Sequence, residues 1–344
     1  MYLPDTYLAA ALLIAVSILC WGSWANFLKA AGRWRFELFY YDYSFGALLC
    51  AVVAAFTLGT FNSKELTFQD NLLITGYRNM AYAAGAGMIF NLANMLLTAA
   101  ISASGMTWAF PIAIGWTLAI DGAVNYFMNP RGELIPVVAG AALTLTASAT
   151  AALAYRARVK AQRAAARAAK PPRAGPKSGK AIGLGISAGI LMSAFYPLLR
   201  FGAWSDPGVG PYGTALLFGA GLWLSTLLLN PFFMYFPLQG KPIEIGNYLA
   251  GGKREHLLGL FAGIVWMIGA LASFAAGTSI SAVEAGLTGS YEIGQGAALL
   301  GALWGLLAWR EIQGSEARVK ALVGAALLCF AAGIYAVTMG SHAK

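Results

Sequence analysis

Long apolar stretches occupy most of the chain and leave it a narrow choice of folds. About 20 mostly apolar residues are needed to cross a bilayer as a helix. Ten stretches have this length: 7–31, 36–60, 78–100, 104–127, 132–155, 181–203, 211–237, 257–279, 285–309 and 318–340. They are too long for the strands of a membrane barrel and do not alternate polar with apolar residues as such strands do. We therefore expect an all-α integral membrane protein with ten transmembrane helices.

The composition agrees with a helical membrane bundle. Hydrophobic residues make up 59% of the chain and charged residues 11%, whereas a typical soluble domain has roughly 25% charged residues. The 41 glycines fall largely within apolar stretches, where small residues let helices approach closely in lipid. The three cysteines also lie in apolar stretches, with no metal-ligand spacing. We expect neither a disulfide framework, nor a metal site, nor a cofactor.

One basic segment divides the apolar stretches into two halves. Residues 156–180 hold nine basic residues and no acidic one, so this linker accounts for the whole net charge of +9. Basic loops are retained on the cytoplasmic side of a membrane. Nucleic-acid binding is the other interpretation of such a run, but the flanking apolar stretches favour a cytoplasmic loop and no nucleic-acid partner. Anionic lipids of the inner leaflet are the expected contact of this linker.

Placing the linker inside fixes the orientation of the other loops. Threading ten spans then puts 18 basic residues on the inner side and five on the outer side. Both termini are expected outside, and a bacterial inner membrane is the expected location. Oligomeric state is not indicated by the sequence.

The two halves, 1–155 and 181–344, are interpreted as repeats of five helices each. An odd number of spans per half gives the halves opposite orientations, the arrangement that underlies alternating access in many transporters. Gly140-Ala141-Ala142-Leu143 matches Gly324-Ala325-Ala326-Leu327, and Ile101-Ser102-Ala103 matches Ile280-Ser281-Ala282. Either match alone is explained by chance between Gly- and Ala-rich helices; their common order favours inverted repeats.

Charged and amide side chains inside spans are costly in lipid and usually face the bundle interior. Glu292 and Gln295 lie three residues apart, so they share one helix face beside Tyr291. We expect this face to bind substrate and Glu292 to exchange a proton. Asp121 is the second candidate for proton coupling, and Asp42, near the inner end of its span, is the candidate gate. The alternative for each is a structural bond to a neighbouring helix.

Other polar and aromatic residues outline the expected substrate cavity. Asn91 and Asn94 again share one helix face, and interhelical hydrogen bonding is as good an explanation as ligand contact. A planar ligand could stack on buried aromatic rings, although packing is the simpler role for each ring alone. The complete predicted binding set is Trp24, Asn26, Asn91, Asn94, Trp108, Tyr196, Trp266, Tyr291, Glu292 and Gln295.

The chain resembles the drug/metabolite transporter superfamily and, within it, the ureide permease family. The resemblance covers nearly the whole chain and is carried by Gly22-Ser23-Trp24, Arg33–Arg35, Tyr41-Asp42-Tyr43, Gly179–Ile186, Glu292-x-x-Gln295, Trp304-Gly305 and Glu311. It implies proton-coupled transport of ureides such as allantoin or nucleobases such as uracil. Plant members carry a nucleotide-binding-like motif in the central loop. Here Gly175–Lys180 is one residue short of a phosphate loop and Ala181 replaces its hydroxyl residue, so no nucleotide site is expected.

These observations predict a secondary transporter of small, polar, planar nitrogen compounds. A sugar or nucleoside transporter of the same superfamily is the alternative, because neighbouring groups share the architecture. No nucleophile–base pair or metal set is evident in the sequence, so we do not expect an enzyme. Direction of transport, coupling stoichiometry and the exact substrate are not indicated.

Overall fold

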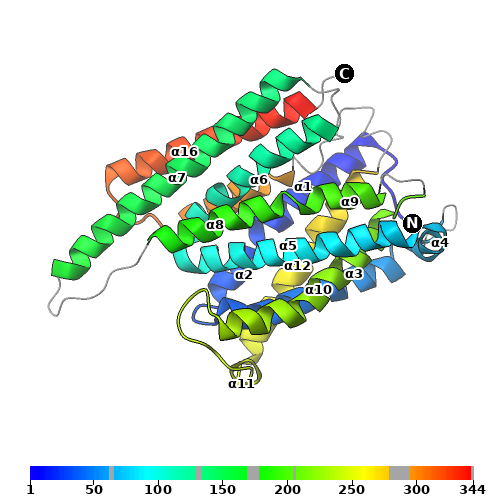
Figure 1. The fold of residues 1–344 in the computed structure, drawn as a ribbon, viewed down its shortest axis with the longest axis horizontal. Helices are drawn as coiled ribbons and strands as arrows, with labels where there is room; N and C mark the ends of the chain where they lie inside the picture. Colours follow the sequence, from blue (N-terminus) through cyan, green and yellow to red (C-terminus); the bar gives the residue numbers. More distant parts are fainter. Residues whose placement is uncertain (62–65, 129–132, 169–177, 204–206, 279–293, 342–344) are drawn as a thin grey trace. The chain divides into compact units, whose positions relative to one another are not determined.

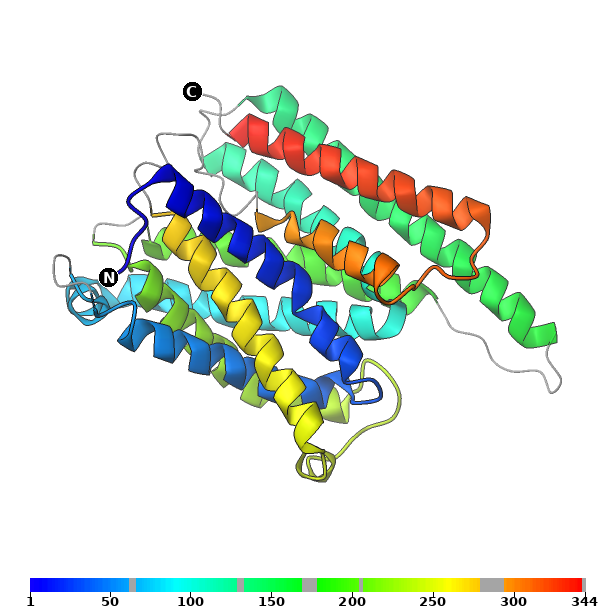
Figure 2. The same cartoon turned by 180° about the vertical axis from the view of Figure 1, so that it is seen from behind.

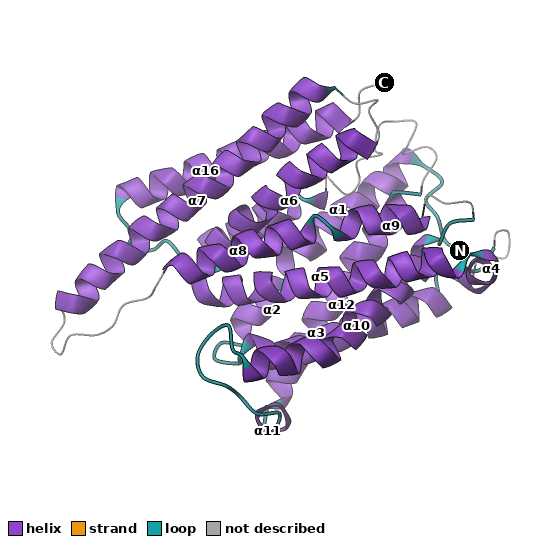
Figure 3. Ribbon diagram, in the orientation of Figure 1, coloured by secondary structure: helices purple, strands orange, loops and turns teal. Residues whose placement is uncertain are grey.

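The computed structural model describes residues 1–61, 66–128, 133–168, 178–203, 207–278 and 294–341. Within these ranges the chain forms helices and loops and no strand (Figure 3). The helices are α1 (Tyr7–Ser23), α2 (Ala25–Ala30), α3 (Phe36–Phe56), α4 (Phe68–Ile74), α5 (Tyr77–Ser104), α6 (Met106–Met128), α7 (Leu134–Ala168), α8 (Ser178–Met192), α9 (Phe195–Ala203), α10 (Pro211–Tyr235), α11 (Gly246–Leu249), α12 (Lys253–Ala276), α15 (Ala297–Leu307) and α16 (Ala317–Ser341).

Nine of the expected membrane spans are present in the described part of the chain. Nine helical stretches are long and apolar enough to cross a bilayer, with α1–α2 and α8–α9 each counted as one. The expected ninth span, 285–309, lies partly outside the described residues. Its described part is α15, which at 11 residues is too short to span by itself. For the described residues the all-helical fold is therefore confirmed, and it fits an integral membrane protein, while the tenth span stays a prediction.

The helix ends follow local sequence signals. The Thr6 hydroxyl accepts a hydrogen bond from the backbone N–H of Ala9 and caps α1. Thr67 and Asp70 form a reciprocal capping box at the start of α4, which also lowers the pKa of the Asp70 carboxyl. Pro211 occupies the first turn of α10, where its missing N–H costs nothing.

The structure changes the expected beginning of the basic linker. Residue 156 was expected to start a loop, but α7 continues without a break to Ala168. The physical reason is composition: alanine, arginine, lysine and glutamine dominate residues 156–168, and all four have high helix propensity. The first half of the linker is therefore a helical extension of the fifth span. Residues 169–177 lie outside the described part of the chain.

Close contacts divide the chain into two compact units, each built from both sequence halves. Unit 1 contains residues 1–95 and 191–297, and unit 2 contains residues 96–190 and 298–344. The division cuts the first half within its third span, at residues 95/96, and the second half within its first and fourth spans, at residues 190/191 and 297/298. The units thus do not coincide with the repeats predicted from sequence, and the inverted repeat itself stays a prediction.

In unit 1, α12 packs along α3 and α1, as Figure 2 shows for α1 and α12. Glycines make the α3–α12 contact possible. A Cβ atom on Gly263 would overlap the carbonyl oxygen of Tyr43, and one on Gly46 would overlap the carbonyl oxygen of Leu260. Such backbone-to-backbone contact is how small residues stabilise helix pairs in lipid.

The two ends of unit 1 gather the loops that the charge pattern assigns to opposite sides. At the predicted inner end, Arg35 Nη1 donates a hydrogen bond of 2.5 Å to the carbonyl oxygen of Lys241. At the predicted outer end, the N–H of Tyr2 donates a bond of 2.8 Å to the carbonyl oxygen of Leu58. The grouping agrees with the predicted threading of this unit.

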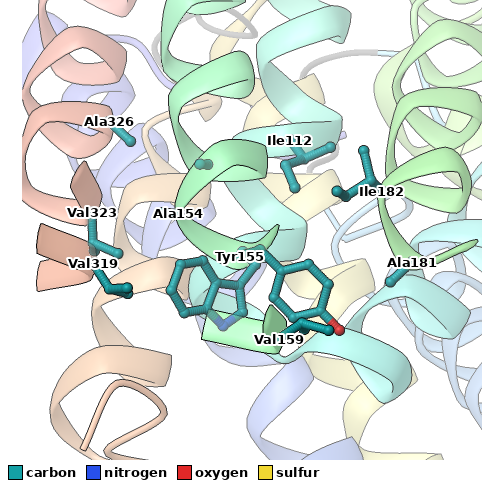
Figure 4. Packing of buried hydrophobic residues seen from close by; sticks show 11 residues of the cluster. Ile112, Ala154, Tyr155, Val159, Ala181, Ile182, Val319, Val323 and Ala326 are labelled. Carbon is teal, nitrogen blue, oxygen red and sulfur yellow. The ribbon is translucent and has the colours of Figure 1, made fainter. Parts of the chain in front are cut away.

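In unit 2, α7 and α16 lie side by side (Figure 1). A Cβ atom on Gly140 would lie 2.7 Å from the backbone nitrogen of Val337, so the two backbones almost touch. The N–H of Glu133 also donates a hydrogen bond of 3.0 Å to the carbonyl oxygen of Gly340. Toward the other end of this pair, Tyr155 and Val323 belong to the buried cluster drawn in Figure 4.

The first turn of α6 is capped by a side chain from the second half of the sequence. The two carboxylate oxygens of Glu311 accept hydrogen bonds from the backbone N–H groups of Met106 (3.0 Å) and Thr107 (2.8 Å). A Cβ atom on Gly305 would lie 2.8 Å from Glu311 Oε2, so glycine leaves room for the carboxylate. An anionic group at a helix N-terminus satisfies free N–H groups and the helix dipole.

Candidate functional site

A buried cluster of amide and phenol groups lies between α3 and α5 in unit 1. Asn94 Nδ2 donates hydrogen bonds of 3.1 Å to the hydroxyls of both Tyr40 and Tyr43. The Trp24 ring lies 5.3 Å from the Tyr43 ring, centroid to centroid. All four side chains are buried. The cluster brings two of the predicted binding residues, Trp24 and Asn94, within reach of one phenol.

Asn91, one turn earlier on α5, is used in a helix–helix contact. Its Nδ2 donates a hydrogen bond of 2.8 Å to Ser225 Oγ, and its Oδ1 accepts one of 3.2 Å from Thr226 Oγ1. Both partners belong to α10. The structure therefore gives Asn91 the interhelical role that the sequence left open, and its contact with a ligand stays a prediction.

A cavity of about 320 Å³ lies at the predicted outer end of unit 1. We call it the outer cavity. Its polar lining comes from Tyr196 and Arg200 on α9, Thr214 on α10, and Ser273 and Thr278 at the end of α12. Phe274 supplies an aromatic surface. The volume is at the lower end of the range for small-molecule sites, which suits a ligand of one or two small rings.

Arg200 is the charged group of the outer cavity among the described residues. Its side chain is 8% exposed, although it carries a guanidinium with five N–H donors. Tyr196 lies four residues earlier, so both side chains share one face of α9. A planar guanidinium beside hydroxyl groups can bind carbonyl and N–H groups of a flat polar molecule together.

A bonded loop holds the mouth of the outer cavity. Asn71 Nδ2 donates a hydrogen bond of 3.0 Å to the carbonyl oxygen of Gly208, and Asn71 Oδ1 accepts one of 2.7 Å from the N–H of Gly210. The Thr75 hydroxyl also donates to the Gly208 carbonyl, at 3.2 Å. These bonds fix the segment that leads into α10, and with it one wall of the cavity.

Trp266 is part of an aromatic stack inside unit 1. Its ring lies 5.7 Å from Phe218, 4.4 Å from Phe90 and 6.0 Å from Trp21, centroid to centroid. The side chain is buried. These contacts account for Trp266 by packing, the simpler of the two roles considered from sequence, and its ligand role stays a prediction.

Asp42, the predicted gate, lies in a hydrogen-bonded group at the predicted inner end of unit 1. The Tyr248 hydroxyl donates a bond of 2.7 Å to Asp42 Oδ1, and His256 Nδ1 lies 2.8 Å from Asp42 Oδ2. Burial and the bond to Asp42 raise the pKa of the Tyr248 phenol, so it remains a donor at neutral pH. We call residues 236–252 the inner segment; Asp42 ties this segment to α3.

A second group of polar contacts, around Arg35 and Glu37, also holds the inner segment against α3. The Arg35 guanidinium forms an ion pair with the buried Glu37 carboxylate and also binds the inner segment through the Lys241 carbonyl. Asn230 Nδ2 on α10 donates a hydrogen bond of 2.6 Å to the Glu37 carbonyl oxygen. Two carboxylates of α3 thus organise the inner end of the unit.

Replacing Asp42 by asparagine should loosen the inner segment. The substitution removes the charge that Tyr248 and His256 share, which is worth about 1 kcal/mol after screening, or roughly a fivefold shift in opening. Maleimide labelling of a cysteine placed at Asn247, in a variant lacking the three native cysteines, should become several-fold faster. Glu244→Gln, in the same segment, is the matched control. If both variants label at the same rate, Asp42 does not hold the inner segment against α3.

The other predicted residues are spread over the two units. Trp108 and Asp121 lie in unit 2, both buried on α6, and Trp108 packs against Tyr155. Gln295 is buried in unit 1. Asn26 Nδ2 donates to the carbonyl oxygen of Ser23, 3.0 Å away.

Tyr291 and Glu292 lie outside the described residues, so the predicted proton site is not placed. In the described part of the chain, no group of three or more His, Cys, Asp or Glu side chains could hold a metal ion.

Arg200 and His256 were not among the site residues predicted from the sequence. Arg200 is one of the five basic residues that the predicted threading places on the outer side. Its spacing of four from Tyr196 was the available signal for a shared face. His256 stands 214 residues after Asp42 in the sequence, so only the packing of α12 on α3 could reveal their contact.

Comparison with known proteins points to permeases. The chain is 24% identical to Ureide permease 1 of Arabidopsis thaliana over 99% of each chain. It is 26% identical to Ureide permease 2 of the same plant over 38% of this chain and 34% of that one. No protein-family model matches. One solved crystal structure is similar with a TM-score of 0.49 and 17% identity, covering 94% of this chain and 95% of its own. The nearly full-length likeness supports a ureide-permease-like transporter.

Proposed function

We propose that the protein is a secondary transporter that carries ureides such as allantoin, or nucleobases such as uracil, across a membrane. The observation that carries this proposal is the likeness to Ureide permease 1, which extends over 99% of both chains. Nine helical stretches with the length and apolarity of membrane spans, found in the described part of the chain, support the same function. The permease names of both relatives favour transport over catalysis.

The outer cavity is the substrate site of this proposal. Ureides and nucleobases are small, flat and rich in carbonyl and N–H groups. The Arg200 guanidinium can donate to two carbonyl oxygens, while the hydroxyls of Tyr196 and Thr214 can accept from N–H groups. Phe274 offers a ring face for stacking. The cavity lies at the outer end of unit 1, where a substrate would first arrive under the predicted orientation.

We further propose a fold, a coupling mechanism and a location for this transporter. The chain would be a member of the drug/metabolite transporter superfamily with ten spans in two inverted repeats, working by alternating access as a proton symporter. Asp42 would gate the inner end, and Glu292 and Asp121 would carry the coupling proton. The membrane would be a bacterial inner membrane, with both termini outside.

Replacing Glu292 by glutamine should separate coupling from binding. Glutamine keeps the shape and hydrogen-bonding capacity of the side chain but cannot release a proton. We expect proton-driven accumulation in proteoliposomes to fall to the level of simple equilibration, while substrate affinity changes by less than about threefold. The double variant Glu292→Gln/Gln295→Glu is the companion and should restore a titratable group three residues along the chain. Full accumulation by Glu292→Gln would remove Glu292 from the coupling mechanism.

The direct test of function is uptake into proteoliposomes that contain the purified full chain. We expect saturable uptake of labelled allantoin or uracil, faster with an inward proton gradient. The same panel includes nucleosides and sugars. Uptake of sugars or nucleosides alone would keep the transporter class and overturn the substrate, and no uptake of any compound would overturn the transporter.

A further inference from the structure

A second cavity, of about 270 Å³, lies in unit 2 between the helical extension of α7 and the turn that leads into α16. We call it the basic cavity. Arg158 and Gln162 line it from α7, and Gln313, Ser315 and Glu316 line it from the turn. By the predicted orientation, this end of the unit faces the cytoplasm. The basic cavity has no part in the proposed transport mechanism.

Arg158, which lines this cavity, has one nitrogen without a hydrogen-bond partner in the described part of the chain. Its Nη1 is buried and has no hydrogen-bond partner among the residues that the structure describes. Its guanidinium carbon lies 5.9 Å from the centre of the Trp108 ring. The side chain is therefore held against the buried cluster of Figure 4, in which Tyr155 and Val159 flank it on α7. A partly desolvated guanidinium gains most from a bound anion.

The surroundings add positive charge. The helical extension of α7, residues 156–168, carries five cations and no acidic residue. Of the two acids on the facing turn, Glu311 caps α6 through two hydrogen bonds, and Glu316 is exposed. Arg158 and Glu316 are the charged residues that line the basic cavity, and the four other cations of the extension make its surroundings positive. This charge favours an anion, and the fork of a guanidinium matches two oxygens of a phosphate.

The place of Arg158 along α7 indicates where the rest of the ligand lies. Arg158 stands three residues past the apolar stretch 134–155, which is long enough to cross a bilayer, so its guanidinium is expected at the level of the lipid headgroups. The acyl chains would lie along the apolar part of α7 while the phosphate reaches Arg158. We propose that the basic cavity binds the phosphate group of an anionic phospholipid of the inner leaflet.

The test compares two arginines on the same helix extension. Arg167 is exposed and does not line the cavity, so Arg167→Ala removes the same charge without touching the site. The purified full chain in neutral detergent is titrated with phosphatidylglycerol or with phosphatidylcholine, and bound lipid is counted by native mass spectrometry. We expect preferential binding of phosphatidylglycerol that weakens about tenfold or more in Arg158→Ala and less than about threefold in Arg167→Ala.

Additional controls separate misfolding, diffuse charge attraction and binding of soluble phosphate from a specific lipid site. Circular dichroism and the elution volume identify misfolding in Arg158→Ala, and Arg158→Gln, which keeps the stem, then serves as the test variant. An equal loss in Arg158→Ala and Arg167→Ala would indicate diffuse attraction to the basic surface and overturn the site. Competition by millimolar inorganic phosphate that abolishes lipid binding would assign the site to a soluble phosphate instead. Equal binding of both lipids would overturn the anion site altogether.

Discussion

Replacing Arg200 by alanine should lower substrate affinity and uptake about a hundredfold. Hydrogen bonds to a charged group contribute about 1.5 kcal/mol or more each, so two bonds from the guanidinium to substrate carbonyls amount to about 3 kcal/mol. The Arg200 side chain is 8% exposed, so water has little access to replace the lost donors. Radiolabelled ureide binding and uptake in proteoliposomes measure the effect.

Two variants separate binding from structure in this experiment. Arg200→Lys keeps the charge but loses the planar fork, and it should recover only part of the affinity. Arg78→Ala removes a charge from the same end of unit 1, where Arg78 stands over the Tyr82 ring and does not line the cavity. It should bind substrate normally. If Arg78→Ala and Arg200→Ala lose the same affinity, the guanidinium of Arg200 does not touch the substrate.

The helical membrane fold was accessible from sequence because hydrophobic length alone specifies a spanning helix. Residues 78–100 and 104–127 illustrate this: the structure has helices at 77–104 and 106–128, divided at Gly105 with a positive φ of 102°. The boundary at residue 156 was wrong because helix propensity, which has no membrane signature, carries α7 onward to Ala168.

The candidate site was less accessible because its groups come from distant parts of the sequence. Asn91 and Asn94 were identified as interior polar residues, but only the packing of α5 against α3 and α10 shows that their amides are used between helices. Arg200 was not identified as an interior residue at all. An arginine near the end of a span normally extends toward the headgroups, and its position in a cavity depends on neighbouring helices.

Replacing Gly263 by alanine should destabilise unit 1 strongly. The added Cβ atom would overlap the Tyr43 carbonyl oxygen and lie 2.8 Å from the backbone nitrogen of Ala47, so no flexible side chain can move aside. The helices α3 and α12 must separate instead. Overpacking of this kind costs about 3 kcal/mol, at the upper end of the usual range.

Gly85→Ala is the matched control for this prediction, because a Cβ at Gly85 meets nothing within 4 Å in the described part of the chain. Alanine is about 1 kcal/mol better than glycine in a helix, so this control should be as stable as the parent or slightly more stable. Unfolding in detergent, followed by circular dichroism against SDS fraction, measures both variants. Separation of α3 from α12 also pulls Asp42 away from His256, so Gly263→Ala should label faster at residue 247 as well. If Gly263→Ala unfolds at the same SDS fraction as Gly85→Ala, the backbones of α3 and α12 do not touch at Tyr43.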